Sequence, residues 1–166
     1  LRLHCSHLLS FVKRSVKILN SSKLHRKVQV WMAKGSTRRE LRFLILRVIP
    51  KRGGGWHPIT GGVEKYERFL MAAKREFTEE IGIPMNDPHL IWLDLKREYC
   101  FNGRWGRARE KSFGVWIPKF KFKLRLDPNE HTKANWVTFY EALDSLNFEN
   151  QRVSLKRLYE KISQKL

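Results

Sequence analysis

Three glutamates, Glu76, Glu79 and Glu80, stand within five residues of one another. At about 100° per residue of an α-helix, their carboxylates spread over roughly 100° of arc. The same spacing predicts an apolar stripe beside them, formed by Leu70, Ala73, Phe77 and Ile81. Like charges one helical turn apart repel each other, and a neighbouring core face raises that cost. A bound divalent cation would turn this unfavourable repulsion into a favourable interaction. Mg²⁺, which takes oxygen ligands, suits such a cluster.

The loop before this segment is rich in glycine. Residues 50–62 include five glycines and two prolines, and glycine lets the backbone approach a phosphate without side-chain clashes. Cations next to a phosphate neutralise charge on its oxygens and lower the pKa of a bound water. The loop and the carboxylates together indicate metal-assisted chemistry on a phosphate compound.

The stretch from Gly61 to Ile83 resembles the Nudix box, G-x5-E-x7-R-E-U-x-E-E-x-G-U, where U is an aliphatic or other bulky apolar residue. The matching residues are Gly61, Glu67, Arg75, Glu76, Phe77, Glu79, Glu80, Gly82 and Ile83. Phe77 is a mild departure at an apolar position, and Tyr66 stands where many members have glycine. The rest of residues 40–163 is also similar to the family's domain. The resemblance implies a Nudix hydrolase, which cuts a pyrophosphate linkage in a nucleotide.

The resemblance also implies roles for these residues. The metal ligands would be Glu76, Glu79, Glu80 and the carbonyl of Gly61, with Mg²⁺ as the cofactor and Mn²⁺ as the alternative. The residues structural in the motif would be Glu67 and Arg75, as a salt bridge between loop and helix, and Gly82. The general base varies in the family, and Glu79 or a carboxylate from a later loop can serve. Glu130, followed by His131, is our candidate for that later carboxylate, so the catalytic candidates are Glu79, Glu80 and Glu130.

Two further stretches are similar to bacterial (deoxy)nucleoside and dihydroneopterin triphosphate pyrophosphatases of this family. Residues 56–64 (WHPITGGVE) resemble their W-x-x-V-T-G-x-x-E loop, and residues 130–150 resemble the end of their domain. The similarity implies hydrolysis of a (deoxy)nucleoside triphosphate between the α and β phosphates, giving monophosphate and pyrophosphate. The alternative substrates are a nucleoside diphosphate sugar, a dinucleoside polyphosphate and the 5′-triphosphate end of RNA.

The substrate-binding candidates are Trp56, His57, Arg97 and Arg107. The two arginines could clamp phosphates, but for each of them a solvated basic face is the favoured explanation. Core packing and loop turns are the alternative explanation for Trp56 and His57. Aromatic residues 99, 101 and 105 either stack on a base or fill a core.

The net charge of +18 favours phosphate-rich partners, whether nucleotides, nucleic acid or anionic lipid, without choosing among them. A nucleic-acid-binding protein that keeps the fold without turnover is therefore the alternative from outside the enzymes, although the intact glutamates argue against it. RNA stays a candidate partner, and a homodimer stays a candidate assembly.

Hydrophobic patterns predict a mixed sheet flanked by helices, and the resemblance implies an α/β (α+β) fold, a Nudix-type α/β/α sandwich. Strands are expected at 41–49, 90–101, 113–117, 119–125 and 136–137, and helices at about 67–81 and 151–164. Gly82 and Pro84 end the first helix, and Thr138 with Glu141 predicts a capping box for a brief helix. The buried stripe of the last helix is expected to contain Leu155, Leu158 and Ile162.

Residues 1–39 are expected to form a basic N-terminal extension, and residues 40–166 the catalytic domain. The extension holds ten Lys or Arg and no Asp or Glu. A short basic amphipathic helix over its first 20 residues would suit a membrane surface, and a transit peptide is an alternative. A third interpretation is upstream sequence before a true start at Met32.

The two cysteines, Cys5 and Cys100, indicate neither a disulfide framework nor a Cys-based zinc site. A reducing interior is the default for such a chain, so we expect a cytoplasmic protein. No apolar run approaches the roughly 18 residues that a membrane-spanning helix needs.

Overall fold

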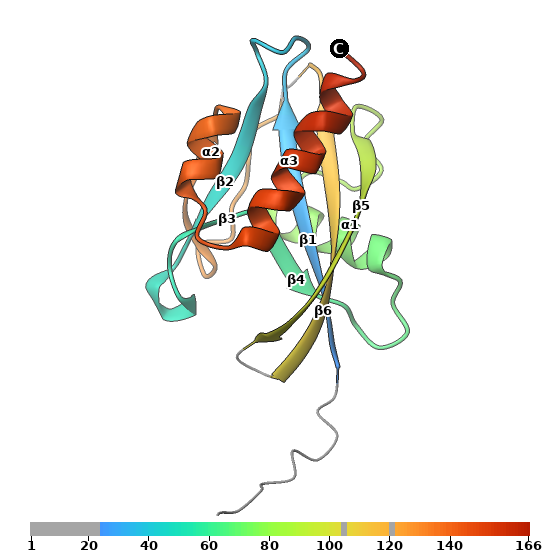
Figure 1. Ribbon diagram of the computed structural model, residues 1–166, viewed down its shortest axis with the longest axis vertical. Coiled ribbons are helices and arrows are strands. Elements are labelled where there is room, and N and C mark those ends of the chain that lie inside the picture. Colours follow the sequence, from blue (N-terminus) through green and yellow to red (C-terminus); the bar gives the residue numbers. More distant parts are fainter. Residues whose placement is uncertain (1–23, 104–105, 120–121) are drawn as a thin grey trace, which may run out of the picture.

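The computed structural model describes residues 24–103, 106–119 and 122–166 (Figure 1). The strands are β1 (His25–Lys34), β2 (Arg42–Val48), β3 (Trp56–His57), β4 (Ile59–Gly62), β5 (Ile91–Gly103), β6 (Gly106–Ile117) and β7 (His131–Val137). The helices are the 3-10 turn η1 (Pro50–Arg52), α1 (Phe69–Ile81), α2 (Phe139–Ser145) and α3 (Glu149–Ser163). None of the helices in the described part of the chain is long and apolar enough to span a membrane.

The strands form one mixed sheet with the order β3-β2-β1-β6-β5, in which β4 also pairs with β1 and β7 with β2. The β1–β6 pair is parallel, and the other pairs are antiparallel. Helix α3 crosses one face of the sheet, α2 lies beside it, and α1 covers the opposite face (Figure 1). The α/β/α sandwich with a mixed central sheet is therefore confirmed.

Strand β1 lies in the middle of this sheet, so the predicted boundary at residue 40 is corrected. It pairs with β6 along its whole length from His25 to Lys34, and Val28, Val30 and Trp31 are fully buried. Basic residues at both ends of β1 made the composition of this segment look like that of an exposed extension, so its buried centre was not predicted. A start at Met32 would remove most of the central strand. The amphipathic helix expected over the first 20 residues lies outside the described residues.

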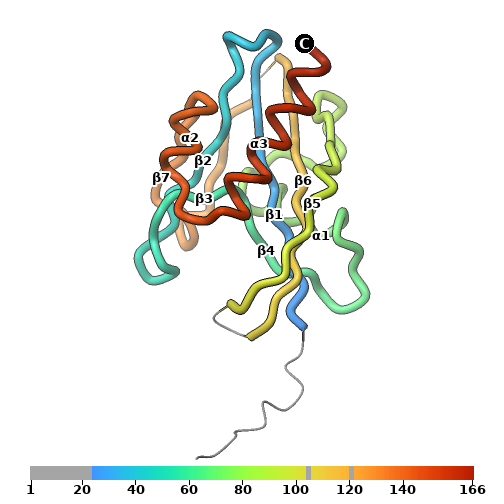
Figure 2. The backbone as a smooth tube through the Cα atoms, in the orientation of Figure 1, coloured from blue at the N-terminus to red at the C-terminus, as the bar shows by residue number. Residues whose placement is uncertain are grey.

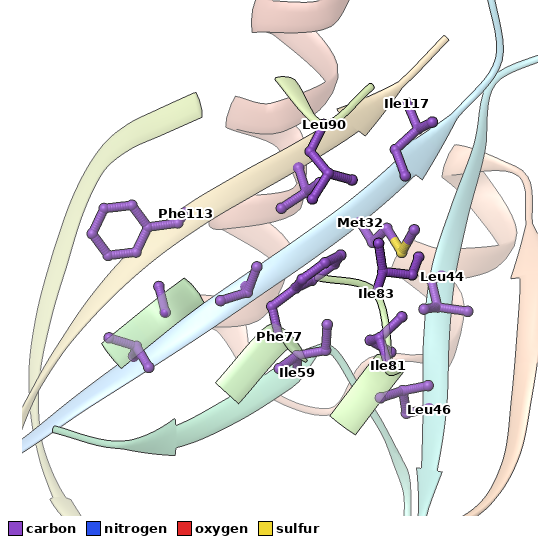
Figure 3. Close-up of a cluster of buried hydrophobic side chains, with 14 of the residues drawn as sticks. Met32, Leu44, Leu46, Ile59, Phe77, Ile81, Ile83, Leu90, Phe113 and Ile117 are labelled. Carbon is purple, nitrogen blue, oxygen red and sulfur yellow. The ribbon is translucent and has the colours of Figure 1, made fainter. Parts of the chain in front are cut away.

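Each face of the sheet has its own hydrophobic core. On the α1 face, Phe77 and Ile81 point toward Met32 and Leu46 (Figure 3). On the other face, the predicted stripe of the last helix is confirmed, because Leu155, Leu158 and Ile162 are buried against the sheet. Close approach of α3 explains Gly114 of β6, where a β-carbon would meet Leu158 Cδ1 at 2.5 Å.

The buried stripe of α1 is rotated from the predicted one. Leu70 is 42% exposed, whereas the buried residues are Ala72, Ala73, Phe77, Glu80 and Ile81. These positions follow the spacing of a single helix face. Glu80 therefore lies within the core-facing stripe rather than beside it.

The strand predicted at 119–125 is wrong, because residues 122–127 have no regular secondary structure. The alternation nevertheless reports burial, since Phe122, Leu124 and Leu126 pack against the α1-side core. The backbone of this segment meets a helix end instead of a strand: Arg125 N donates to Ile81 O at 3.0 Å.

The helix ends follow the local signals. Gly82 ends α1 and donates its N–H to Thr78 O. Its φ of 76° is in the left-handed region, which glycine adopts at little cost. Thr138 and Glu141 form the predicted capping box at the start of α2. The predicted strand at 41–49 and the last helix correspond to β2 and α3.

Candidate functional site

The carboxyl group of Glu80 is buried without a hydrogen-bond partner. Its residue is 3% exposed, and neither Oε1 nor Oε2 has a hydrogen-bond partner of good geometry among the described residues, although the backbone N–H of Thr60 lies close enough to favour the ionised form. The ring of His131 lies close by, with its Nε2 3.5 Å from Glu80 Oε2. A buried polar group normally finds a partner, so this carboxyl is placed for something other than packing.

Glu80, Glu130 and His131 each present a ligand atom within 4.8 Å of the others. His131 is the first residue of β7, and Glu130 precedes it in a turn closed by Glu130 N donating to Asp127 O. Ile49 N donates to Glu130 O at 3.0 Å, which fixes this turn against the residue before η1. This candidate metal-ligand group is therefore assembled from α1 and from the start of β7.

The charges of this group fit a cation. Burial, with repulsion from Glu130 and Glu76, raises the pKa of Glu80 to about 9. Burial also lowers the pKa of His131, and its Nδ1 has no partner among the described residues. The Glu80 carboxylate and the His131 imidazole, which have unpartnered atoms, form with the Glu130 carboxylate a donor set that a divalent cation can satisfy.

Glu76 lies next to Gly61, which belongs to β4. A β-carbon on Gly61 would overlap the Glu76 carboxyl group, so the packing of this carboxyl requires glycine. Arg75 Nη1 donates to Glu76 Oε1 at 2.9 Å. Burial still raises the pKa of Glu76 despite that contact.

Arg75 ties the loop to the helix as predicted. Its Nε and Nη2 each donate to Glu67 at 3.0 Å, and Nη2 also donates to Gly62 O at 2.8 Å. This pair of hydrogen bonds lowers the pKa of Glu67. Glu79 also receives a hydrogen bond from Arg75, at 3.2 Å, but its side chain is 57% exposed.

A cleft with a volume of about 1620 Å³ opens over the metal-ligand group. Its acidic wall contains Glu80, Glu130 and His131. Its basic lining contains Arg26, Lys27, Lys51, Arg52 and Lys65. Neither Glu76 nor Glu79 is among the lining residues, although Gly61 is. The cleft therefore places acidic ligands and basic side chains around one space.

Strands β1, β6 and β5 run past the helices at one end of the sheet (Figure 2), and residues of this end form one side of the cleft, its floor. Lys27, Glu110 and Tyr99 are paired across the three strands and all line the cleft. The next row toward the open end contains His25, Ala108 and Phe101. The first turn of α3 closes the other side of the cleft with Asn150 and Gln151.

Of the predicted substrate-binding residues, His57 alone is among those lining the cleft. Trp56 packs against the α3-side core. Arg107 is exposed on β6 and alternates with the cleft-lining Gly106 and Ala108, so it faces the other side of the sheet. The guanidinium of Arg97 lies 5.9 Å from the centre of the Tyr99 ring, outside the lining.

Both ring nitrogens of His57 are held by hydrogen bonds. Nε2 lies 3.0 Å from Gly54 O, and Nδ1 lies 2.9 Å from Gln151 Nε2. The carbonyl can only accept, so Nε2 carries the proton and Nδ1 accepts from the amide. Burial lowers the pKa of His57, in agreement with this neutral form. His57 thus joins the glycine loop to α3.

Reading the sequence missed several cleft residues, among them Arg52, Lys27 and Glu110. Arg52 forms an ion pair with Glu130 at 2.5 Å. Glu110 is buried on the inward face of β6, between Ala108 and Ser112. An acidic residue among small inward-facing residues of a strand was the signal that could have identified it.

Comparisons with known proteins identify the family of this chain. A family model described as the NUDIX domain matches residues 23–159. The Myxococcus xanthus protein named octanoyltransferase is 34% identical over 124 residues, which are 71% of this chain. The chain spans only 32% of the length of that protein, so the activity in its name belongs to a much longer chain.

Two solved structures share the fold. A Caenorhabditis elegans Ap4A hydrolase in a binary complex has a TM-score of 0.73 and 17% identity, over 85% of this chain and 99% of that one. The Escherichia coli dihydroneopterin triphosphate pyrophosphohydrolase has a TM-score of 0.70 and 21% identity, over 84% of this chain and 99% of that one. At such identities the similarity establishes the fold and not the substrate.

Proposed function

This chain belongs to the NUDIX domain family and is a Nudix hydrolase, and from that premise we propose that it hydrolyses a (deoxy)nucleoside triphosphate between the α and β phosphates. One water is consumed, and the products are a nucleoside monophosphate and pyrophosphate. The observation that carries the proposal is the unpartnered Glu80 carboxyl, grouped with Glu130 and His131 at the wall of a basic cleft.

We assign the metal to this group. Glu80 and His131 would hold the ion beside Glu130, and Glu76 and the carbonyl of Gly61 lie next to them along α1 and β4. Mg²⁺ is the first choice because most of the donors are oxygens. Since one donor is an imidazole nitrogen, Mn²⁺ should be tested beside it. When bound, the ion neutralises charge that develops on phosphate oxygens.

Glu130 is the better candidate for the general base. It lines the cleft, whereas Glu79 does not, and Glu79 is held by Arg75 on an exposed side of α1. Glu130 would take the proton of the attacking water, and its ion pair with Arg52 would hold the carboxylate in place. A base must lie within hydrogen-bond reach of the water that it activates.

The lining of the cleft supports a polyphosphate substrate. Arg26, Lys51, Arg52 and Lys65 can face the negative charges of several phosphates. Both solved structures described above carry names of polyphosphate substrates, a dinucleoside tetraphosphate and a pterin triphosphate. The triphosphate is our choice because the loop at residues 56–64 is similar to that of the triphosphate pyrophosphatases.

The test is a substrate panel with Mg²⁺ or Mn²⁺ and identified products. The panel contains the NTPs, dNTPs, diadenosine tetraphosphate, ADP-ribose, a UDP-sugar and triphosphorylated RNA. We expect monophosphate and pyrophosphate from a triphosphate, with no turnover in EDTA. Preferred cleavage of another compound, or release of a single phosphate, would contradict the proposal.

Two pairs of variants assign the residues. Glu80→Gln should lower kcat by on the order of 100-fold or more, because charge stabilisation at the phosphate is lost. Glu160→Gln, on the exposed face of α3, is its control. Glu130→Gln should lower kcat far more than Glu79→Gln, and the opposite order would make Glu79 the base.

A further inference from the structure

Glu110 is a buried acid in the substrate cleft that the metal chemistry does not use. It lies in the middle of the cleft floor, between Lys27 of β1 and Tyr99 of β5. It is 3% exposed and yet belongs to the cleft lining. A buried carboxyl that borders a ligand space is costly unless it is hydrogen-bonded.

One carboxylate oxygen of Glu110, Oε1, accepts two hydrogen bonds. Asn150 Nδ2 donates to Oε1 at 2.9 Å and Gln29 Nε2 donates to the same atom at 3.1 Å. The orientation of the Gln29 amide is fixed in turn, since its oxygen accepts from Trp31 Nε1 at 2.8 Å. Two N–H donors occupy the lone pairs of Oε1. Among the described residues, none is recorded as donating to Oε2.

Oε2 is therefore the atom of Glu110 that a ligand would meet. Tyr99 and Phe101 lie on the same floor and offer aromatic surface next to it. Phe148, which precedes α3, lines the cleft and is 53% exposed. Flat apolar walls around one hydrogen-bond acceptor form a site that suits a heteroaromatic ring with an N–H on its edge.

We infer that Glu110 is the residue that selects the ring of the nucleotide, with Oε2 accepting a hydrogen bond from an exocyclic amino group. This inference rests on the proposed function and names the substrate class as triphosphates of amino-bearing rings. Burial opposes the ionised carboxylate, and Lys27, Asn150 and Gln29 favour it. A ring without the amino group would leave a desolvated carboxylate oxygen unpaired.

The test uses pairs of triphosphates that differ by one amino group. The pairs are GTP with ITP, ATP with purine riboside triphosphate, and CTP with its 4-deamino analogue. In the wild type we expect kcat/KM to favour the amino-bearing member of the preferred pair by roughly 10- to 100-fold. In Glu110→Gln, Asn150 and Gln29 continue to donate to the side-chain oxygen of residue 110, which turns the new NH₂ group toward the ligand. The preference for the amino-bearing ring should then vanish or invert.

Two further variants complete the design. Glu110→Asp keeps the charge but withdraws the oxygen by one methylene, and it should also lower the preference. Glu98→Gln, an exposed acid of β5 in ion pairs with Arg109 and Lys111, should leave the preference unchanged. If Glu110→Gln changes both members of every pair by the same factor, the inference is overturned and Glu110 has a structural role only.

Binding without turnover separates this inference from the proposed function. Dissociation constants for α,β-methylene analogues of the same pairs are measured by calorimetry. The same preference, and its loss in Glu110→Gln, are expected there. If no triphosphate is hydrolysed but the binding preference is found, the proposed reaction fails and the selecting role of Glu110 stands. Equal binding of both members by the wild type would overturn it.

Discussion

Glu80 occupies a position on α1 where a helix normally presents an apolar side chain. Ala73, Phe77 and Ile81 share its face and belong to the core. A carboxyl group in such a place costs stability unless a partner compensates for its lost hydration. If the proposed assignment of the metal is right, the bound cation supplies this compensation, and Glu80 lowers the stability of the metal-free fold in exchange for activity.

That cost predicts how stability depends on pH without metal. The pKa of Glu80 rises from 4.5 in a model peptide to about 9 in the folded protein. Between these values the folded state binds more protons than the unfolded state, so stability is full at low pH and is lost as pH rises. The largest slope from one such group is about 1.4 kcal/mol per pH unit.

Thermal unfolding in EDTA from pH 5 to pH 8.5 checks this expectation. The Tm of the wild type should fall toward high pH, and saturating Mg²⁺ should restore it. Glu80→Gln should show a shallower fall, with the remainder due to Glu76 and Glu110, whose pKa values are also raised by burial. A Tm that rises with pH, or an identical slope in the variant, would refute the role assigned to Glu80.

At the residue level, the sequence predicts the types of group in the site better than their neighbours. The Glu67–Arg75 bridge could be predicted because the box places both residues, and it is present in the structure. The grouping of Glu80 with His131 could not be predicted, because the two residues are 51 positions apart in the chain and only the fold brings them together. Glu110 lacks any local motif, and its significance depends on Gln29 and Asn150, which are distant in the chain.

At the level of elements, the turn into α1 contains a strained residue. Tyr66 has φ 66° and its side chain is 89% exposed, so nothing in its burial offsets the left-handed conformation. This is the position where many family members have glycine. Tyr66→Gly should therefore raise stability by up to about 1 kcal/mol, reduced by the greater freedom of the unfolded chain.

Tyr66→Ala is the matched control, because it removes the ring but keeps the β-carbon that causes the strain. In chemical denaturation, the free energy of unfolding of Tyr66→Gly should be higher than that of Tyr66→Ala. Equal values would mean that the backbone at this turn relaxes without cost.

Strand β1 predicts the effect of shortening the chain. A chain that begins at Met32 lacks Val28, Val30 and Trp31, and it leaves β4 and half of β6 without their partner. It should not fold cooperatively. A chain that begins at Lys23, where the family match starts, should show a sharp thermal transition. A folded and active chain from Met32 would mean that another segment can replace this strand.

Helix ends with local signals and the strands that became β2, β5, β6 and β7 were predicted, whereas β1 was missed and the strand at 119–125 was predicted wrongly. Gly82 and the Thr138–Glu141 box mark helix ends through contacts within four residues. The alternation in residues 119–125 is just as regular, but alternation reports burial of every second side chain and not the presence of a neighbouring strand. The strand β1 was not predicted because its apolar centre is short and lies between basic residues.

At the level of the whole molecule, the cleft combines charges of both signs. The acids that face the metal site come from α1 and the turn before β7, and the basic lining comes from β1, η1 and the loop after β4. The net charge of +18 adds a general attraction for anions. Substrate binding should thus depend on ionic strength more than the chemical step does.

Raising NaCl from roughly 50 mM to roughly 300 mM should raise KM several-fold, because the Debye length shortens and phosphates are screened from the cleft. The value of kcat should change much less. Lys51→Gln, in the cleft lining, should raise KM at low salt and weaken its salt dependence, whereas Lys165→Gln near the chain end should not. A salt effect confined to kcat would contradict this assignment.

The high pKa of Glu80 makes cation uptake an exchange reaction. Near neutrality the metal-free carboxyl keeps its proton, so an arriving ion must displace it into the solution. Calorimetric heats measured at one pH should then differ between Tris and HEPES, since each buffer absorbs the liberated proton with its own ionisation enthalpy. Acidification would consequently empty the centre of its ion well before it unfolds the chain.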